Sequence, residues 1–260
     1  LWQPSQDEGT IEKVQERRNL FYRQDEIRTK SFAANLDQVL ILIAAEPEYS
    51  ESQLSRALIA AEAEHITPLI ALNKSDLPAL HAQAWSRLAP YRACGYPMLS
   101  MSLSHDSDAQ LQPLIEALTG KTTLVLGPSG VGKSTLINRL VPGALAETNE
   151  ISQALNSGKL TTTSTSWYWV DRASNTALID SPGFQEFGLR HIEPMQLAAY
   201  MPDLKPHVAQ CKFYNCTHLH EPGCGVQAAV AADEASGGIS PRRYKIYGDL
   251  FAELSEPPRY

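Results

Sequence analysis

The sequence has no long hydrophobic run: no stretch approaches the ~20 consecutive apolar residues that a membrane-spanning helix needs. The N-terminus also lacks the charged and apolar segments of a secretory signal peptide. We therefore expect a cytoplasmic protein that does not associate with membranes. The first residue is leucine instead of methionine, which indicates a processed or truncated chain.

Basic residues are fewer than acidic ones: 22 Lys and Arg against 29 Asp and Glu give a formal net charge of −7. This balance argues against broad, nonspecific binding to nucleic acid, although it leaves room for a local basic face. Hydrophobic residues make up 43% of the chain and charged residues 20%, as in an ordinary globular protein. A chain of 260 residues can bury a large core and contain more than one domain.

Between about residues 31 and 190, apolar runs that suit buried strands alternate with stretches that suit helices. The predicted strands are 38–43, 67–72, 96–101, 122–126, 167–170 and 176–179, and the predicted helices are 54–65, 111–118 and 133–140. This alternation predicts a three-layer α/β domain with ligands at the carboxyl ends of the strands. Residues 1–30 are interpreted as the last strands of a small β domain. Residues 191–260 are interpreted as a helical domain, with helices at 191–204 and 240–254.

Residues 127–134 match the complete phosphate-binding loop pattern and lie between a predicted strand and a predicted helix. Glycines let backbone N–H groups wrap the phosphates, and the N-terminus of the following helix favours negative charge. Lys133 is expected to neutralise the β- and γ-phosphates, and Ser134 is expected to bind Mg²⁺. The predicted nucleotide-binding residues here are Gly127, Pro128, Ser129, Gly130, Val131, Gly132, Lys133, Ser134 and Thr135.

A base-recognition motif lies upstream, at the end of the predicted strand 67–72. It consists of Asn73, Lys74, Ser75 and Asp76. The Asp76 carboxylate can accept hydrogen bonds from N1–H and the exocyclic amine of guanine, a pair that adenine does not offer, so the motif favours GTP over ATP. Ser102, after the next strand, is a further predicted contact near the base. In an ordinary GTPase the phosphate loop comes first, so the reversed order predicts a circularly permuted sheet.

Two further segments are expected to reach the γ-phosphate and Mg²⁺. Asp180, at the end of a strand, would hold Mg²⁺ while the Gly183 N–H meets the γ-phosphate; a simple Asp-Ser-Pro-Gly turn is the alternative. One threonine of 161–163, assigned as Thr162, would close over Mg²⁺ when triphosphate is bound, unless the segment is an ordinary polar loop. Phe184 stands where many GTPases have the glutamine that orients water, so unaided hydrolysis should be slow. The predicted catalytic residues are Lys133, Thr162, Asp180 and Gly183.

Three of the four cysteines are clustered. The pattern Cys211-x4-Cys216-x-His218-x5-Cys224 supplies three thiolates and one imidazole, which suits one structural, tetrahedral Zn²⁺. His220 is an alternative imidazole. Cys94 stands apart and is interpreted as a small buried hydrophobic residue.

These elements together resemble the bacterial ribosome small-subunit-dependent GTPase A family. The resemblance also covers Arg17-Arg18-Asn19, Asn35-Leu36-Asp37-Gln38, Gly158-Lys159-Leu160-Thr161-Thr162 and Glu221-Pro222-Gly223-Cys224. It implies an N-terminal oligonucleotide-binding β-barrel, a permuted GTPase domain and a zinc-bearing helical domain. It also implies a protein that binds the small (30S) ribosomal subunit and its rRNA and hydrolyses GTP late in the maturation of that subunit. The subunit is expected to stimulate the hydrolysis. We further expect a monomer.

Two departures from the family pattern are visible in the sequence. The chain begins too late to hold the whole barrel, and Leu160 stands where the family usually has histidine. Two other functions are therefore kept open: a GTP-dependent switch that docks a protein through its zinc domain, and a zinc-stabilised RNA-binding scaffold with little turnover. Basic residues near the start, and Arg242, Arg243 and Lys245 near the end, are either rRNA phosphate contacts or merely solvated.

Overall fold

The computed structural model describes residues 2–5, 8–11, 13–14, 16–144, 165–182, 187–232 and 238–257. A six-stranded sheet lies at its centre, with the strand order β7-β6-β5-β8-β10-β9. All neighbouring strands in it are parallel except β9, which runs antiparallel to β10 at one edge. The strands are β5 (Gln38–Ala44), β6 (Thr67–Asn73), β7 (Met98–Ser100), β8 (Thr122–Leu126), β9 (Ser166–Asp171) and β10 (Thr176–Asp180).

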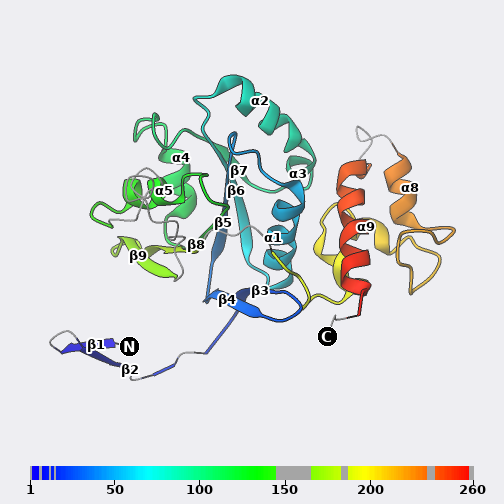
Figure 1. The fold of residues 1–260 in the computed structure, drawn as a ribbon, viewed down its shortest axis with the longest axis horizontal. Helices are drawn as coiled ribbons and strands as arrows, with labels where there is room; N and C mark the ends of the chain where they lie inside the picture. The colour runs from blue at the N-terminus through cyan, green and yellow to red at the C-terminus, as the bar shows by residue number, and fades with distance from the viewer. Residues whose placement is uncertain are drawn as a thin grey trace.

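Helices cover both faces of this sheet (Figure 1). Every residue of β5 is buried, as expected for a central parallel strand. Alternate β5 side chains enter two different cores: Val39, Ile41 and Ile43 pack on the side of α1, whereas Leu40 and Leu42 pack on the side of α4 and α5. The helices of this part are α1 (Glu51–Ala63), α2 (Pro78–Arg87), α3 (Ala89–Ala93), α4 (Gln112–Leu118) and α5 (Lys133–Leu140).

The order of the strands along the chain differs from their order in the sheet. The chain enters the sheet at β5, builds β6 and β7 outward, and then returns to place β8 on the other side of β5. The parallel register pairs Ile41 of β5 with Leu126 of β8, the last strand residue before the phosphate-binding loop. The base motif on β6 therefore precedes the phosphate loop on β8 in sequence, while both lie at the same edge of the sheet.

The N-terminal strands are antiparallel hairpins: β1 (Trp2–Ser5) pairs with β2 (Glu8–Ile11), and β3 (Leu20–Gln24) pairs with β4 (Thr29–Ala34). Two polar motifs fasten the second hairpin to the start of β5. Asn19 exchanges two hydrogen bonds of 2.9 Å with the backbone of Leu36, and Arg18 pairs with Asp37 at 2.5 Å. Asp37 also accepts the Thr122 N–H at 2.8 Å, so these residues tie β5 to β8.

The C-terminal region contains the 3-10 helix η1 (Pro194–Tyr200), α7 (Lys205–Val208), α8 (Gly225–Ala231) and α9 (Pro241–Ser255). Their buried residues form one continuous core with the α1 face of the sheet. The predicted helix over 191–204 is wrong: within the described stretch 187–204, the helical structure is the short η1. Pro202 disfavours α-helical geometry in the residue before it, so the chain turns at Met201 and restarts at α7.

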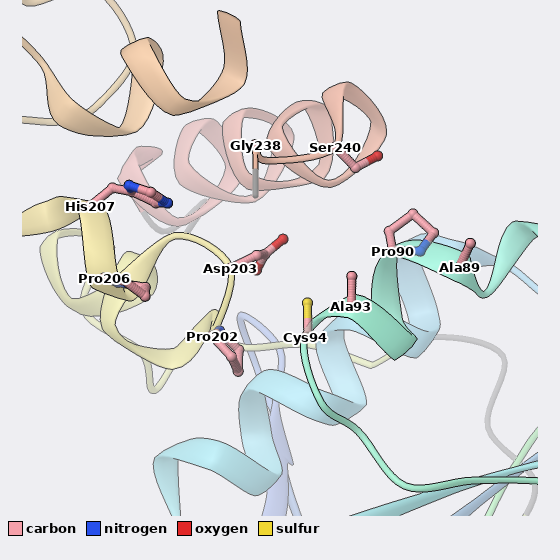
Figure 2. Close-up of a pocket in the computed structure, with 10 residues that line it drawn as sticks. All are labelled: Ala89, Pro90, Ala93, Cys94, Pro202, Asp203, Pro206, His207, Gly238 and Ser240. Atoms are coloured by element: carbon pink, nitrogen blue, oxygen red, sulfur yellow. The ribbon is translucent and has the colours of Figure 1, made fainter. Parts of the chain in front are cut away.

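A cavity of about 510 Å³ opens between α3 and the C-terminal region. Figure 2 shows Ala93 and Cys94 on one wall and Pro202, Asp203 and His207 opposite. Cys94 is half-buried, and burial raises the pKa of its thiol to about 12. No helix in the described part of the chain is both long and apolar enough to cross a bilayer.

Candidate nucleotide site and metal centre

The phosphate loop and the base motif meet through Asn73. Its side-chain amide donates to the carbonyl oxygen of Val131, in the phosphate loop, at 2.8 Å. Its side-chain oxygen accepts the Leu103 N–H at 2.9 Å, which brings in the loop after β7. Asn73 is buried, so both bonds lie in a low-dielectric setting. The Asn73 side chain thereby holds together two segments that lie 30 and 58 residues further along the chain.

Two positions of the phosphate loop require glycine, because atoms of neighbouring strands approach them too closely for a side chain. A Cβ on Gly132 would lie 2.5 Å from the Asn73 amide nitrogen, and Gly132 has φ +105°, in the left-handed region. A Cβ on Gly127 would lie 2.3 Å from the Leu42 carbonyl oxygen of β5. The loop can therefore sit against both strands only with glycine at these positions.

Asp76 and Ser102 are brought together at the base side of the site. The Ser102 hydroxyl donates to a carboxylate oxygen of Asp76 at 2.5 Å. This hydrogen bond is the largest cause that lowers the pKa of Asp76, so the carboxylate is ionised and can accept hydrogen bonds. Lys74 has φ +66°, a tight turn that places Asp76 beside Ser102.

Lys133 and Asp180 form the charged floor of the phosphate site. The Lys133 amine donates to the carbonyl oxygens of Gly127 and Pro128, each at 2.9 Å. Burial lowers the pKa of Lys133 to about 8, although the nearby Asp180 carboxylate opposes this shift. Burial also raises the pKa of Asp180, against the influence of Lys133.

One oxygen of Asp180 is buried without a hydrogen-bond partner among the described residues. An orphaned carboxylate oxygen at the end of a strand beside the phosphate loop fits a divalent cation, because hard cations prefer such ligands. Ser134, Thr135 and Ser129 lie on the same loop and the start of α5. Thr162, Gly183, Phe184 and Leu160 lie outside the described residues.

Two residues that no motif singled out organise the loop after β7. Arg139 of α5 donates to the Leu103 carbonyl at 2.8 Å and to the Asp106 carbonyl. His105 places Nδ1 3.2 Å from the Ser102 hydroxyl and 3.6 Å from the Asp76 carboxylate. Neither residue belongs to a sequence pattern, because the contacts arise only when separate segments fold together.

The second site is the cluster of Cys211, Cys216, His218 and Cys224, whose ligand atoms all lie within 4.8 Å of one another. The Cys211 and Cys224 sulfurs are 3.8 Å apart, and His218 Nδ1 is 3.3 Å and 3.6 Å from them. Tetrahedral zinc with ordinary bond lengths would separate two sulfurs by about 3.8 Å and sulfur from nitrogen by about 3.5 Å. These three distances therefore match those of a zinc site, and Cys216 supplies the fourth ligand atom of the cluster.

Helix α9 holds the cysteine loop in place. Tyr244 donates to the His218 carbonyl and Tyr247 to the Thr217 carbonyl, each at 2.7 Å. His218 has φ +64°, which turns its ring into the cluster. The alternative ligand His220 lies apart from the cluster, with 79% of its side chain exposed.

Arg243 is not a free basic residue. Its side chain is 1% exposed and makes two hydrogen bonds of 2.9 Å to Asp203 and one of 2.9 Å to Ser55. The hypothesis that Arg243 contacts rRNA is therefore wrong, because the guanidinium is used to join α9 to α1. Arg242 and Lys245 remain exposed, beside Glu51 and Asp249 respectively.

Fold and site together define a P-loop GTPase whose sheet is circularly permuted. A family model described as RsgA GTPase matches residues 14–190, so the chain belongs to the RsgA GTPase family. The chain is 71% identical over 255 residues to the small ribosomal subunit biogenesis GTPase RsgA of Variovorax paradoxus, covering 98% of this chain and 80% of the relative. It is 51% identical over 252 residues to the protein of the same name from Burkholderia mallei, with 97% and 78% covered.

Two solved structures resemble the whole arrangement. YjeQ from Thermotoga maritima superposes with a TM-score of 0.74 at 30% identity, over 96% of this chain and 80% of that chain. YloQ, described as a circularly permuted GTPase, superposes with a TM-score of 0.72 at 30% identity, over 100% and 80%. These similarities confirm the predicted permuted sheet.

Proposed function

We propose that this protein hydrolyses GTP and acts in the biogenesis of the small ribosomal subunit, to which it binds. The observation that supports the proposal most directly is the hydrogen bond of the Asn73 side chain to Val131. It joins the base motif to the phosphate loop, which supports a single guanine-nucleotide pocket. The names of the 71% and 51% identical relatives support the ribosomal part of the proposal.

The proposed roles follow from the positions of the side chains. Asp76, with Ser102, would read the guanine edge, while Lys74 would cover the base and Ser75 would continue the turn. Residues 127–135 would bind the phosphates through their backbone amides, with Lys133 supplying positive charge. Mg²⁺ bound with the nucleotide would be held by Ser134 and Asp180 and would neutralise charge on the β- and γ-phosphates. Thr162 and Gly183 remain sequence-based predictions for the γ-phosphate side.

The decisive experiment measures GTP turnover with and without purified small ribosomal subunits, at several salt concentrations. We expect slow turnover alone and stimulation by the subunit that weakens as salt rises, because phosphate contacts are screened. Large subunits serve as the control partner, and Lys133→Ala serves as the inactive variant. Tight GTP binding without turnover in the presence of small subunits would instead favour an RNA-binding scaffold.

We further propose that the cysteine cluster holds one structural Zn²⁺ through Cys211, Cys216, Cys224 and Nδ1 of His218. The matching inter-ligand distances support zinc, and all four positions come from the protein, which leaves no open coordination site. Metal analysis of the purified protein should give about one zinc per chain. Cys216→Ser should lose it, whereas Cys94→Ser, at a cysteine outside the cluster, should retain it.

We also propose three functional units, with boundaries near residues 30 and 190, in a monomer that works in the cytoplasm. The antiparallel hairpin β1–β2 before residue 30 and the cysteine cluster after β10 support this division. Hydrogen exchange would test the division, since each unit should show its own level of protection on either side of the two boundaries. Size-exclusion chromatography with light scattering would test the monomer.

A further inference from the structure

His105 stands beside the base motif without belonging to it. Its Nδ1 atom lies 3.2 Å from the Ser102 hydroxyl, and that hydroxyl lies 2.5 Å from the Asp76 carboxylate. The three side chains form a short chain from solvent to the base-reading group: the His105 side chain is 68% exposed, Asp76 is 29% exposed and Ser102 is buried.

The direction of the protons along this chain is fixed by elementary chemistry. An ionised carboxylate can only accept, so the single Ser102 hydroxyl proton points at Asp76. The Ser102 oxygen must then accept from His105, which places a hydrogen on Nδ1 of the imidazole. Each donor in such a chain polarises the next, which strengthens the bond that reaches Asp76.

The loop that presents His105 is fixed at several points. The Ser102 N–H donates to the Asp106 carboxylate at 2.7 Å, and the N–H groups of His105 and Asp106 donate back to the Ser102 carbonyl at 3.2 and 2.8 Å. Arg139 of α5 also donates hydrogen bonds to backbone carbonyls of the same turn. The imidazole is therefore supported from the phosphate-loop helix.

We propose that His105 is a positioning residue for guanine recognition: its Nδ1–H orients the Ser102 hydroxyl, which in turn sets the Asp76 carboxylate for paired bonding to the base. This inference rests on the proposed binding of GTP. Guanine needs both carboxylate oxygens, one for N1–H and one for the 2-amino group. Hypoxanthine, which lacks the 2-amino group, needs only one, so a misoriented carboxylate harms guanine binding more.

The test compares the dissociation constants of GDP and inosine diphosphate for the full chain. His105→Ala should weaken the binding of GDP by about three- to tenfold, as expected for the loss of one hydrogen bond, and the binding of inosine diphosphate by less than about twofold. His105→Asn, whose amide N–H lies where Nδ1–H was, should restore the GDP affinity, whereas His105→Gln should not. His81→Ala is the matched control, because His81 also bonds a serine hydroxyl, that of Ser100 at 2.8 Å, whereas the described contacts of the Asp76 side chain are with Ser102 and His105.

A double-mutant cycle separates this relay from a merely structural effect. In the Ser102→Ala background, His105→Ala should cause a much smaller further loss of GDP affinity, because only the direct 3.6 Å approach of Nδ1 to the Asp76 carboxylate is left. Additive losses, or equal losses for GDP and inosine diphosphate, would overturn the inference while leaving GTP binding intact. If the unmodified protein bound neither nucleotide, the proposed function itself would fall.

Discussion

Gly132 lies against Asn73, at the point where the two nucleotide motifs meet. Because its φ is +105° and a Cβ would lie 2.5 Å from the Asn73 amide, Gly132→Ala should displace Asn73 and break its bonds to Val131 and Leu103. We expect GDP affinity to fall by more than about tenfold, since unsatisfied buried groups cost about 1–3 kcal/mol each.

Gly143→Ala is the matched control for this substitution. Gly143 also has positive φ, +88°, but a Cβ added there would have no atom within 4 Å. The substitution should cost about 1–2 kcal/mol of unfolding free energy through backbone strain alone and leave GDP affinity unchanged. Equal GDP affinities for the two variants, measured by fluorescent-nucleotide titration, would contradict the packing argument.

Lys133 makes nucleotide binding depend on pH. Burial lowers the pKa of its ammonium to about 8 in the free protein, so the charge that phosphates need is lost as the pH rises through this value. GDP affinity should therefore fall by about tenfold between about pH 7 and pH 9. Lys133→Arg, which stays charged, should flatten this dependence in the same titrations. Because the nucleotide titrates identically with both proteins, the arginine variant is also the control for protonation of the nucleotide. An unchanged slope in the arginine variant would show that another group titrates.

At the scale of elements, Arg243 fastens α9 to α1 and to the segment before α7. Arg243→Ala would leave Asp203, itself mostly buried, without its partner, and should lower the unfolding free energy by about 3–5 kcal/mol. Its neighbour Arg242, which is 67% exposed, provides the control: Arg242→Ala should cost about 0–1 kcal/mol. Urea unfolding of the two variants gives the comparison, and similar midpoints would show that the buried pair contributes little.

The strands of the central sheet were predictable because their sequences are almost continuously apolar. The runs that became β5, β6 and β8 could only be buried strands, given their length and the turn residues after them. Helix α2 was not predicted, because only Ala84 of its residues is buried and no apolar period marks it. Helix α8 is short and follows the cysteine loop, so it too lacks a local signal.

The candidate site was predictable where a local motif carries its chemistry, as in the phosphate loop and the Asn73–Asp76 motif. His105 and Arg139 were not, because they act through contacts between segments that the sequence keeps apart. The sequence predicted His218 as the imidazole ligand but did not settle its choice over the alternative, His220. It depends on a single left-handed residue, His218, that turns one ring inward.

At the scale of the whole molecule, residues 187–190 join three parts of the chain. The Gln24 N–H donates to the Gly188 carbonyl at 3.1 Å, and the Arg190 N–H donates to the Gln24 carbonyl at 2.9 Å. Phe187 packs against Phe21 and Phe32, with ring centroids 5.7 and 6.1 Å away. Arg56 of α1 donates to the Phe187 carbonyl at 3.2 Å and also pairs with Glu253 of α9.

Gly188→Ala tests the fit of this junction. A Cβ would lie 2.4 Å from the Gln24 carbonyl oxygen, so the substitution should push β3 away. We expect a loss of about 1–3 kcal/mol and faster hydrogen exchange at the Gln24 and Arg190 amides. In Gly248→Ala the nearest atom, on Leu219, is 3.5 Å away, so that helical variant should be as stable as the parent or more so. Unchanged exchange at Gln24 in Gly188→Ala would argue against a tight junction.

The pairing of Gln24 with Gly188 and Leu189 brings the two ends of the nucleotide-binding stretch side by side. When the two ends of a folded stretch lie next to each other, the position at which the chain starts does not decide which strands pair in the sheet. Beginning at β5 instead of β8 leaves each neighbour in the sheet unchanged, and the chain after Asp180 continues toward the cysteine cluster.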